Sequence, residues 1–536
     1  MPNDQTVKLF KGTLILAVAA LLTKILSAFY RIPFQNIVGD VGFYIYQQVY
    51  PFYGIAVALS TYGFPIVISK LYALESEKKE KGNMKQLLTV SGLFLLCVGL
   101  LCFFLLYLGS ETLAQHMDDP QLAPLLRMVA WVFLFMPVIS LFRGFFQGSG
   151  DMLPTAVSQI SEQFIRVATI LAAAFFLMSQ SSSLYVVGRG AVFGSVTGGL
   201  VSVIILLLFW LRRRTVKESG PHRAYGKGKI KAILTVLTVE GFTICVSSML
   251  LIFIQLADSL NLYSLLVQSG IGGEEAKELK GVYDRGQPLI QLGTVVATSM
   301  SLSLVPLITR EKMRGNTIFL QEKISSALKI SILVGAGATI GLWNIIKPTN
   351  MLLFENTDGS NVLALLSTLI LLGSVIMTIT AILQGLGSSV FPALVILCSL
   401  ALKYGFNEFL VGKKGITGAA LASILALVFI LVLLISKLRT MVGTALIQKR
   451  FFFTVVFASS AMIAVLQLYL YLTDFIYTLG YSARLLAGFQ ALTAVLFGGV
   501  VYTVFILRGN VFKEEELSLL PFGSKLIIFL PKKNRR

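Results

Sequence analysis

The chain has 536 residues, of which 56% are hydrophobic and 13% are charged, and its formal net charge is +19. Its mean hydropathy is +0.81, and because a soluble domain has about 25% charged residues, the composition excludes an ordinary soluble globular protein. Apolar runs of about 20 residues recur along the whole length, each long enough to cross about 30 Å of hydrocarbon. The composition therefore predicts an all-α polytopic membrane protein.

Apolar windows between polar breaks predict the membrane spans in chain order. Fourteen spans are expected, at residues 12–38, 44–70, 87–108, 125–147, 155–178, 189–211, 232–257, 284–309, 324–346, 362–385, 389–410, 415–436, 451–473 and 484–507. The first window is too long for the apolar core of a signal peptide, so we expect it to be retained as the first helix.

The loop charges predict which side of the membrane the two ends of the chain face. Alternate loops, beginning with the N-terminal tail, hold 30 of the 45 Lys and Arg residues, whereas the opposite loops hold seven. Because Lys and Arg concentrate in cytoplasmic loops, both termini are predicted to lie in the cytoplasm, with the protein in the bacterial plasma membrane. The basic excess then reflects topology and attraction to membrane lipids, and no nucleic-acid partner is needed to explain it.

The sequence predicts neither a metal site nor a cofactor. Cys97, Cys102, Cys245 and Cys398 all fall inside apolar runs, where we expect them to be small buried hydrophobic residues. The chain has two histidines and no glycine-rich loop of the P-loop type, so ATP hydrolysis is not expected. The protein is therefore predicted not to be an enzyme.

A long basic connection suggests how the spans are grouped. We predict an N-lobe of six spans at 1–211, a cytoplasmic linker at 212–231, a C-lobe of six spans at 232–436, spans 13 and 14 at 437–507, and a basic cytoplasmic tail at 508–536. Two lobes with the same orientation in the membrane are parallel repeats, an arrangement found in transporters that alternate access to a central site.

An internal repeat supports this grouping. The segment FFQGSGDMLP at 145–154 recurs as ILQGLGSSVFP at 382–392. Gln147, Gly148 and Gly150 match Gln384, Gly385 and Gly387, all at an offset of 237 residues. Ordered matches at one offset indicate two pseudo-symmetric halves.

Five basic residues lie inside or at the edge of predicted spans. Lys24 is about twelve residues into the first span, which is about 18 Å deep at the helical rise, and Arg31 lies two turns further on nearly the same face. Arg166 and Lys403 are near mid-membrane at matching positions of the repeat, and Arg285 opens span 8. A central Lys or Arg costs about 2.5–3.5 kcal/mol, so we predict that all five line a wet, positive cavity for a phosphate or pyrophosphate.

Local partners offer a second interpretation of some of these charges. Arg166 follows Glu162 at the i+4 spacing of a helical ion pair, and Lys403 has Glu408 five residues further on. Arg31 is near the outer interface and could snorkel, and Arg143, near a span end, is expected to snorkel.

Acidic residues are candidates for gating or coupling. They are Asp40, Glu162, Glu240 and Asp284, of which Glu240 is the acid deepest in span 7. Asp258 ends span 7 and is expected at the outer interface.

Several of these segments carry a family resemblance. The stretch from KGTLILAVAALLTKILSAFYRIPF at residue 11 to FPIVISK at residue 70, the turns QGSGDMLP and QGLGSSVFP, and the segment GITGAALAS resemble polysaccharide biosynthesis and export proteins. The similar branch is the stage V sporulation protein B-like and MurJ-like group of the multidrug/oligosaccharidyl-lipid/polysaccharide (MOP) exporter superfamily.

The resemblance implies fourteen helices in two lobes around a V-shaped cavity, with spans 13 and 14 beside a groove for a lipid tail. It also implies that the protein moves an undecaprenyl-pyrophosphate-linked sugar, such as lipid II, to the outer leaflet. On the matching positions it implies that Lys24, Arg31 and Arg285 contact the pyrophosphate and that Asp40 lies near the outer gate. Lys24 stands where an arginine is expected, and lysine lacks the bidentate guanidinium fork.

Three other functions remain as alternatives. A cation-coupled multidrug antiporter of the MATE type would share the fold but would place acids in the cavity. A membrane glycosyltransferase would need carboxylates or histidines in the outer loops, and a structural scaffold gives no reason for central charges. Five bases against two deep acids, Glu162 and Glu240, favour the flippase. The predicted partners are a lipid-linked anionic sugar and membrane lipids, with a coupling ion left open.

Overall fold

The computed structural model describes residues 4–77, 81–213, 227–313, 317–443, 447–479 and 481–509. Within these ranges the regular secondary structure is entirely helical, which confirms the predicted all-α class. Most of the predicted linker at 212–231 and nearly all of the predicted tail at 508–536 lie outside the described residues.

The chain forms two compact units. Unit 1 comprises Met1–Asp284 and Ser389–Ala419, and unit 2 comprises Arg285–Ser388 and Ala420–Arg536. The helices of unit 1 are α1 (Asp4–Phe29), α2 (Arg31–Ala58), η1 (Leu59–Gly63), α3 (Phe64–Glu77), α4 (Lys81–His116), η2 (Pro120–Leu122), α5 (Ala123–Ala130), α6 (Val132–Gly148), α7 (Leu153–Ser179), α8 (Leu184–Arg213), α9 (Lys227–Val236), η3 (Leu237–Gly241), α10 (Phe242–Ser248), α11 (Leu250–Gln268) and α12 (Gly273–Asp284). Those of unit 2 are α13 (Gly286–Gly293), α14 (Val295–Met313), α15 (Thr317–Asn344), α16 (Ile346–Phe354), α17 (Ser360–Gly385), α19 (Lys449–Thr473), η4 (Asp474–Leu479) and α20 (Ala483–Arg508), while α18 (Val390–Val442) contributes to both.

Twelve helical runs in the described chain are long and apolar enough to cross a membrane, so the protein is a multi-pass membrane protein. Two of them, Ile15–Ser76 and Val390–Val442, have 62 and 53 residues, and each covers two predicted spans. Gly39 (φ 69°) and Gly415 (φ 55°) interrupt these runs in a backbone conformation that favours glycine. The window 284–309 is not among the twelve, so the count of fourteen spans stays a prediction.

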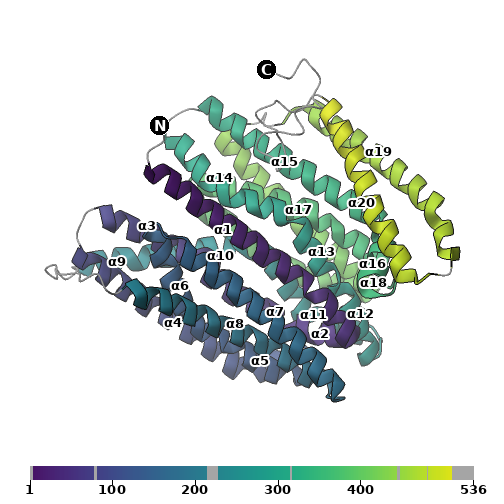
Figure 1. Ribbon diagram of the computed structural model, residues 1–536, viewed down its shortest axis with the longest axis horizontal. Coiled ribbons are helices and arrows are strands. Elements are labelled where there is room, and N and C mark those ends of the chain that lie inside the picture. The colour runs from purple at the N-terminus through teal and green to yellow at the C-terminus, as the bar shows by residue number, and fades with distance from the viewer. Residues whose placement is uncertain are drawn as a thin grey trace. The chain divides into compact units, whose positions relative to one another are not determined.

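Large apolar side chains cover the outside of several helices. In unit 2, α19 and α20 pack against each other as the yellow pair in Figure 1 and leave Phe453 74% and Leu485 71% exposed. Such surfaces are unfavourable in water and match a hydrocarbon solvent. The expectation that all four cysteines are buried is wrong, because Cys97 and Cys398 are exposed on long apolar helices.

The two turns of the internal repeat have the same structure. Gly150 lies two residues after the end of α6 with φ +80°, and Gly387 lies two residues after the end of α17 with φ +84°. Each turn closes with the same pair of backbone hydrogen bonds, characteristic of a Schellman motif. The amides and acceptors are Gly150 to Gln147 and Asp151 to Phe146 in the first turn, and Gly387 to Gln384 and Ser388 to Leu383 in the second.

Matched glycines also bring matched helices together. A Cβ on Gly148 would lie 2.9 Å from the carbonyl oxygen of Ser69 in α3, and one on Gly385 would lie 2.8 Å from Cβ of Ile308 in α14. Thus α6 packs on α3 within unit 1 as α17 packs on α14 within unit 2. The repeat read from the sequence therefore extends to helix packing.

Candidate functional site

Two buried arginines lie among tyrosine rings in unit 1. Arg31 begins α2 and Arg166 lies in α7, and each side chain is 1% exposed. The guanidinium carbon of Arg31 lies 4.1 Å from the ring centre of Tyr50, and that of Arg166 lies 5.0 Å from Tyr30 and 4.4 Å from Tyr53. Arg166 also lies 5.9 Å from Tyr50, so both arginines face one ring.

We call the group formed by Arg31, Arg166, Tyr30, Tyr46, Tyr50 and Tyr53 the arginine–tyrosine cluster. The hydroxyls of Tyr30 and Tyr46 are 2.8 Å apart, which joins the end of α1 to α2. Three of the four tyrosines follow from local geometry, because Tyr46, Tyr50 and Tyr53 recur at the i, i+4, i+7 spacing of one helix face. The sequence prediction missed them, although this spacing beside buried bases was a usable signal.

The cluster holds unused hydrogen-bond donors. Nε and Nη1 of Arg31, and Nε and Nη2 of Arg166, are buried and have no hydrogen-bond partner among the described residues. Neither guanidinium forms a salt bridge with a described carboxylate. Cation–π contacts contribute about 0.5–2 kcal/mol each and do not replace hydrogen bonds to a buried charge. The arrangement therefore suits an anionic guest that accepts from both guanidiniums.

Arg143 of α6 lies in a buried network of hydrogen bonds and one ion pair. It is fully buried, and the expectation that it snorkels is wrong. Its Nη2 donates to Oε2 of Glu162 at 2.7 Å, and its other donors reach Ser158, Thr61 and Ser202 at 3.0–3.1 Å. Glu162 thus neutralises Arg143, and an ion pair between Glu162 and Arg166 is not seen.

Lys403 lies in a second buried network in unit 1. Its Nζ is 2.8 Å from Oδ1 of Asp258 and donates to Oδ1 of Asn407 at 2.7 Å and to the carbonyl oxygen of Ala419 at 2.6 Å. All three ammonium donors are used. Asp258 is 1% exposed and accepts a further hydrogen bond from Tyr283 at 2.9 Å. Lys403 pairs with Asp258 and not with Glu408.

The remaining acids also have described partners. Asp284 pairs with Lys280 one turn earlier in α12 at 2.7 Å, and both side chains are buried. Asp40 accepts from Gln35 at 2.9 Å. Glu240 pairs with Lys70 of α3 at 2.8 Å, with both side chains partly exposed.

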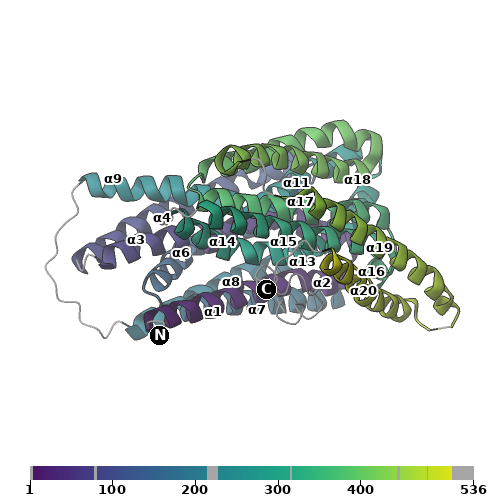
Figure 2. The same cartoon turned by 90° about the horizontal axis from the view of Figure 1, so that it is seen from above.

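The Glu240 contact sits at a tight helix crossing in unit 1. Glu240 belongs to the π-helical turn η3, which packs on α3, and the preceding helix α9 packs on α4 (Figure 2). A Cβ on Gly63, which ends the π-helical turn η1, would lie 1.8 Å from Sγ of Cys245, and one on Gly241 would lie 2.8 Å from Phe64. The glycines of the π-helical turns η1 and η3 thus allow η1 to pack closely on α10 and η3 to pack closely on α3.

Lys24 and Arg285 have surroundings of their own. Lys24 is half-buried in α1 and makes no hydrogen bond or salt bridge with a described residue. Arg285, in unit 2, is fully buried; its Nη1 donates to Asn356 at 2.6 Å, and its guanidinium lies 5.3 Å from the Phe354 ring centre. Of the four predicted bases in unit 1, Arg31 and Arg166 face the same tyrosine ring, that of Tyr50. The described residues hold no cluster of His, Cys, Asp and Glu suited to a metal.

A close backbone contact positions Asp40, and it leads to a stability prediction. A Cβ on Gly281 of α12 would lie 2.1 Å from the carbonyl oxygen of Asp40. Since backbone cannot move aside as a side chain can, Gly281→Ala should lower the free energy of unfolding by about 1–3 kcal/mol or more. The measurement is the thermal inactivation midpoint of the detergent-purified protein. Gly272→Ala is the control, because a Cβ there has no atom within 4 Å; equal midpoints for the two variants would contradict the contact.

Solved structures of membrane transporters have a fold similar to that of this chain. The lipid II flippase MurJ in an inward closed conformation matches with a TM-score of 0.66 at 17% identity, over 92% of this chain and 98% of that one. An inward-facing multidrug resistance MATE family transporter of the MOP superfamily matches with a TM-score of 0.62 at 15% identity, over 79% and 96%. The chain has the fold of these membrane transporters.

Sequence comparison shows the family. A profile described as polysaccharide biosynthesis protein matches residues 9–312. The uncharacterized membrane protein YabM of Bacillus subtilis (strain 168) is 44% identical over 98% of this chain and 97% of its own length. From the same organism, the lipid II flippase MurJ is 26% identical over 78% and 80%, and stage V sporulation protein B is 23% identical over 97% and 98%. The chain therefore belongs to the polysaccharide biosynthesis protein family, and it is similar to MurJ and to stage V sporulation protein B.

Proposed function

We propose that this protein moves an undecaprenyl-pyrophosphate-linked sugar, lipid II or a related cell-wall or polysaccharide precursor, across the bacterial plasma membrane by alternating access. The observation that carries the proposal is the arginine–tyrosine cluster, with two buried guanidiniums and no carboxylate of their own. A pyrophosphate would accept the unused donors and neutralise both charges, which offsets its loss of hydration. Similarity to a lipid II flippase supports the choice of cargo.

The ion pairs that the buried acidic residues form argue against a cation-coupled drug antiporter. Such a transporter needs a carboxylate available to a cation or a proton. Among the described residues, three carboxylates pair with fully buried bases: Glu162 with Arg143, Asp258 with Lys403 and Asp284 with Lys280. The likeness to MATE transporters is a likeness of fold.

We further propose how the chain lies in the membrane and what the remaining predicted site residues do. Both termini lie in the cytoplasm, and the lobes are 1–211 and 232–436, followed by two helices whose exposed apolar faces suit a lipid tail. Lys24 and Arg285 are assigned to the pyrophosphate path. Asp40, Glu240 and Asp284 are assigned to gating, with the Lys70–Glu240 pair as a contact that opening would break.

Flipping of a fluorescent undecaprenyl-pyrophosphate sugar in proteoliposomes tests the function. The wild type should expose the probe to an outside quencher faster than empty vesicles, and Lys24→Ala and Arg285→Ala should each slow it by about tenfold or more, since a hydrogen bond to a charged group contributes about 1.5–3 kcal/mol. Vesicles are matched for inserted protein. Transport of cationic dyes on a proton or sodium gradient, with no flipping of the lipid probe, would replace the proposal by the antiporter.

A further inference from the structure

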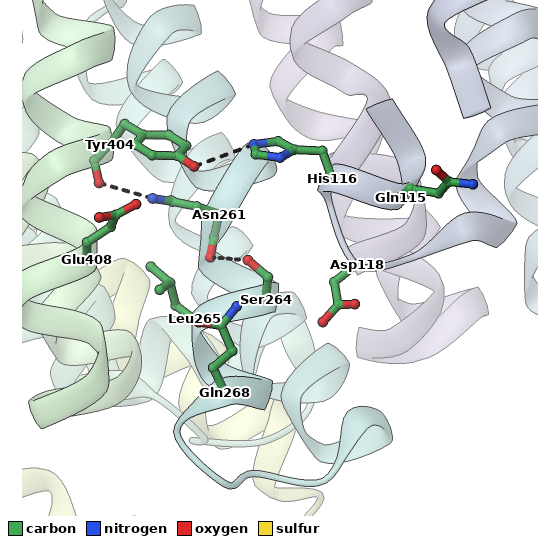
Figure 3. A pocket seen from close by; sticks show the side chains of 9 residues that line it. All are labelled: Gln115, His116, Asp118, Asn261, Ser264, Leu265, Gln268, Tyr404 and Glu408. Carbon is green, nitrogen blue, oxygen red and sulfur yellow. Dashed lines mark hydrogen bonds between the residues drawn. The ribbon is translucent and has the colours of Figure 1, made fainter. Parts of the chain in front are cut away.

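A polar pocket of about 550 Å³ opens in unit 1 between the end of α4, the end of α11 and the first part of α18 (Figure 3). Its rim carries the side chains of Gln115, His116, Asp118, Gln268, Tyr404 and Glu408. These positions adjoin the loops that are poor in Lys and Arg, and hence the side that the predicted topology places outside the cell. None of the residues of the arginine–tyrosine cluster lines it.

Most side chains of the rim have hydrogen-bonding groups that a ligand could use. The side chains of Gln115, Asp118, Gln268 and Glu408 form no hydrogen bond or salt bridge with any residue that the structure describes, and all four residues are exposed. Two carboxylates accept hydrogen bonds, and two amides both accept and donate. The exposed aromatic contact is between His116 and Tyr404, whose rings lie parallel with centres 6.5 Å apart. The pocket therefore combines hydrogen-bond donors, hydrogen-bond acceptors and aromatic rings that a ligand could contact.

The floor of the pocket is held in place by the buried network below it. Asn261 is 3% exposed, donates to the carbonyl oxygen of Tyr404 at 3.0 Å and accepts from Asn407 at 2.8 Å. Asn407 also donates to Asp258 at 3.0 Å, which connects the floor to the Lys403 ion pair. A floor fixed by buried hydrogen bonds is preorganised, which lowers the cost of ordering a ligand.

The charge of the pocket selects among ligands. No Lys or Arg lines it, while Asp118 and Glu408 add negative charge, so it would repel a pyrophosphate. No metal-binding cluster of acids, histidines and cysteines occurs in the described part of the chain. A sugar ring instead presents hydroxyl and amide groups that both donate and accept, and a volume of this size lies within the usual range for small-molecule sites.

We propose that this pocket is a second binding site, on the outer side of unit 1, for the neutral sugar part of the translocated substrate. The inference rests on the proposed flippase function and deepens it. The arginine–tyrosine cluster would bind the pyrophosphate and the outer pocket would bind the sugar, so that the two parts of one headgroup are recognised by opposite electrostatic environments. The acidic rim also disfavours return of the pyrophosphate from the outside.

Binding of a lipid-free sugar tests this site without any transport step. The probe is di-N-acetylchitobiose, observed by saturation-transfer NMR with the full-length protein in nanodiscs. Wild-type protein should give a saturable signal. Glu408→Ala and Gln268→Ala should each weaken binding by about tenfold, because the sugar would lose hydrogen bonds to the Glu408 carboxylate and with the Gln268 amide. Because both side chains are exposed, neither change should disturb folding.

Two controls separate the possible outcomes. Glu111→Ala removes an exposed carboxylate of α4 that pairs with Arg127 outside the pocket, and Arg166→Ala alters the arginine–tyrosine cluster; both should keep wild-type sugar binding. Absent binding, or equal binding by all variants, overturns the pocket assignment even if lipid flipping is observed. Binding of a cationic lysine peptide but not of the sugar also overturns it. Sugar binding without lipid flipping leaves the pocket standing and overturns the flippase function.

Discussion

Arg166→Ala is expected to reduce flipping of an undecaprenyl-pyrophosphate sugar by about 10- to 150-fold, because a hydrogen bond to a charged group contributes about 1.5–3 kcal/mol. Arg166 is buried, with Nε and Nη2 lacking a partner among the described residues. The measurement is the initial rate of probe exposure in proteoliposomes, together with competition by inorganic pyrophosphate. Arg166→Lys should recover part of the rate, since it keeps the charge and loses the bidentate fork.

The matched control for this experiment is Arg127→Ala. Arg127 is 42% exposed and pairs with the exposed Glu111, and such surface pairs contribute about 0–1 kcal/mol, so its rate should stay within about fivefold of wild type. A folded Arg166→Ala protein with wild-type flipping would remove the arginine–tyrosine cluster from the mechanism. Equal losses in Arg166→Ala and Arg127→Ala would point to a general effect of charge removal.

Asp258→Asn is expected to lower the free energy of unfolding by about 3–5 kcal/mol, since it leaves the buried ammonium of Lys403 without its counter-charge. Lys403→Met leaves the carboxylate of Asp258 with hydrogen bonds from Tyr283 and Asn407, so its loss should be smaller. The measurement is the rate of thermal inactivation in detergent, a kinetic quantity suited to proteins that unfold irreversibly.

The double variant Lys403→Met/Asp258→Leu decides between a structural pair and a transport residue. Replacing both partners by apolar groups should recover much of the lost stability, because no buried charge remains. Lys413→Met, at an exposed lysine of the same helix, controls for charge removal alone. A Lys403→Met protein of normal stability that no longer flips lipid would instead support the predicted cavity role of Lys403.

Part of the candidate site was predictable from the sequence because it depends on local spacing and on the cost of charge in hydrocarbon. Arg31 and Arg166 were selected for that cost, and both are buried. Three of their tyrosine neighbours share one face of α2 at i, i+4, i+7, a pattern that the sequence itself displays. The same reasoning misplaced Arg143, because distance to a span end says nothing about which partners another helix supplies.

Sequence by itself determined the membrane class, the loop-charge asymmetry and the paired turns at Gly150 and Gly387, since composition, apolar length and glycine at positive φ are local properties. Only the tertiary structure decided which charges are neutralised. Lys403 meets Asp258 across 145 positions of the chain, whereas Arg31 and Arg166 meet aromatic rings and keep unused donors. The Lys403–Asp258 ion pair arises from packing between distant segments, and no spacing along one helix encodes it.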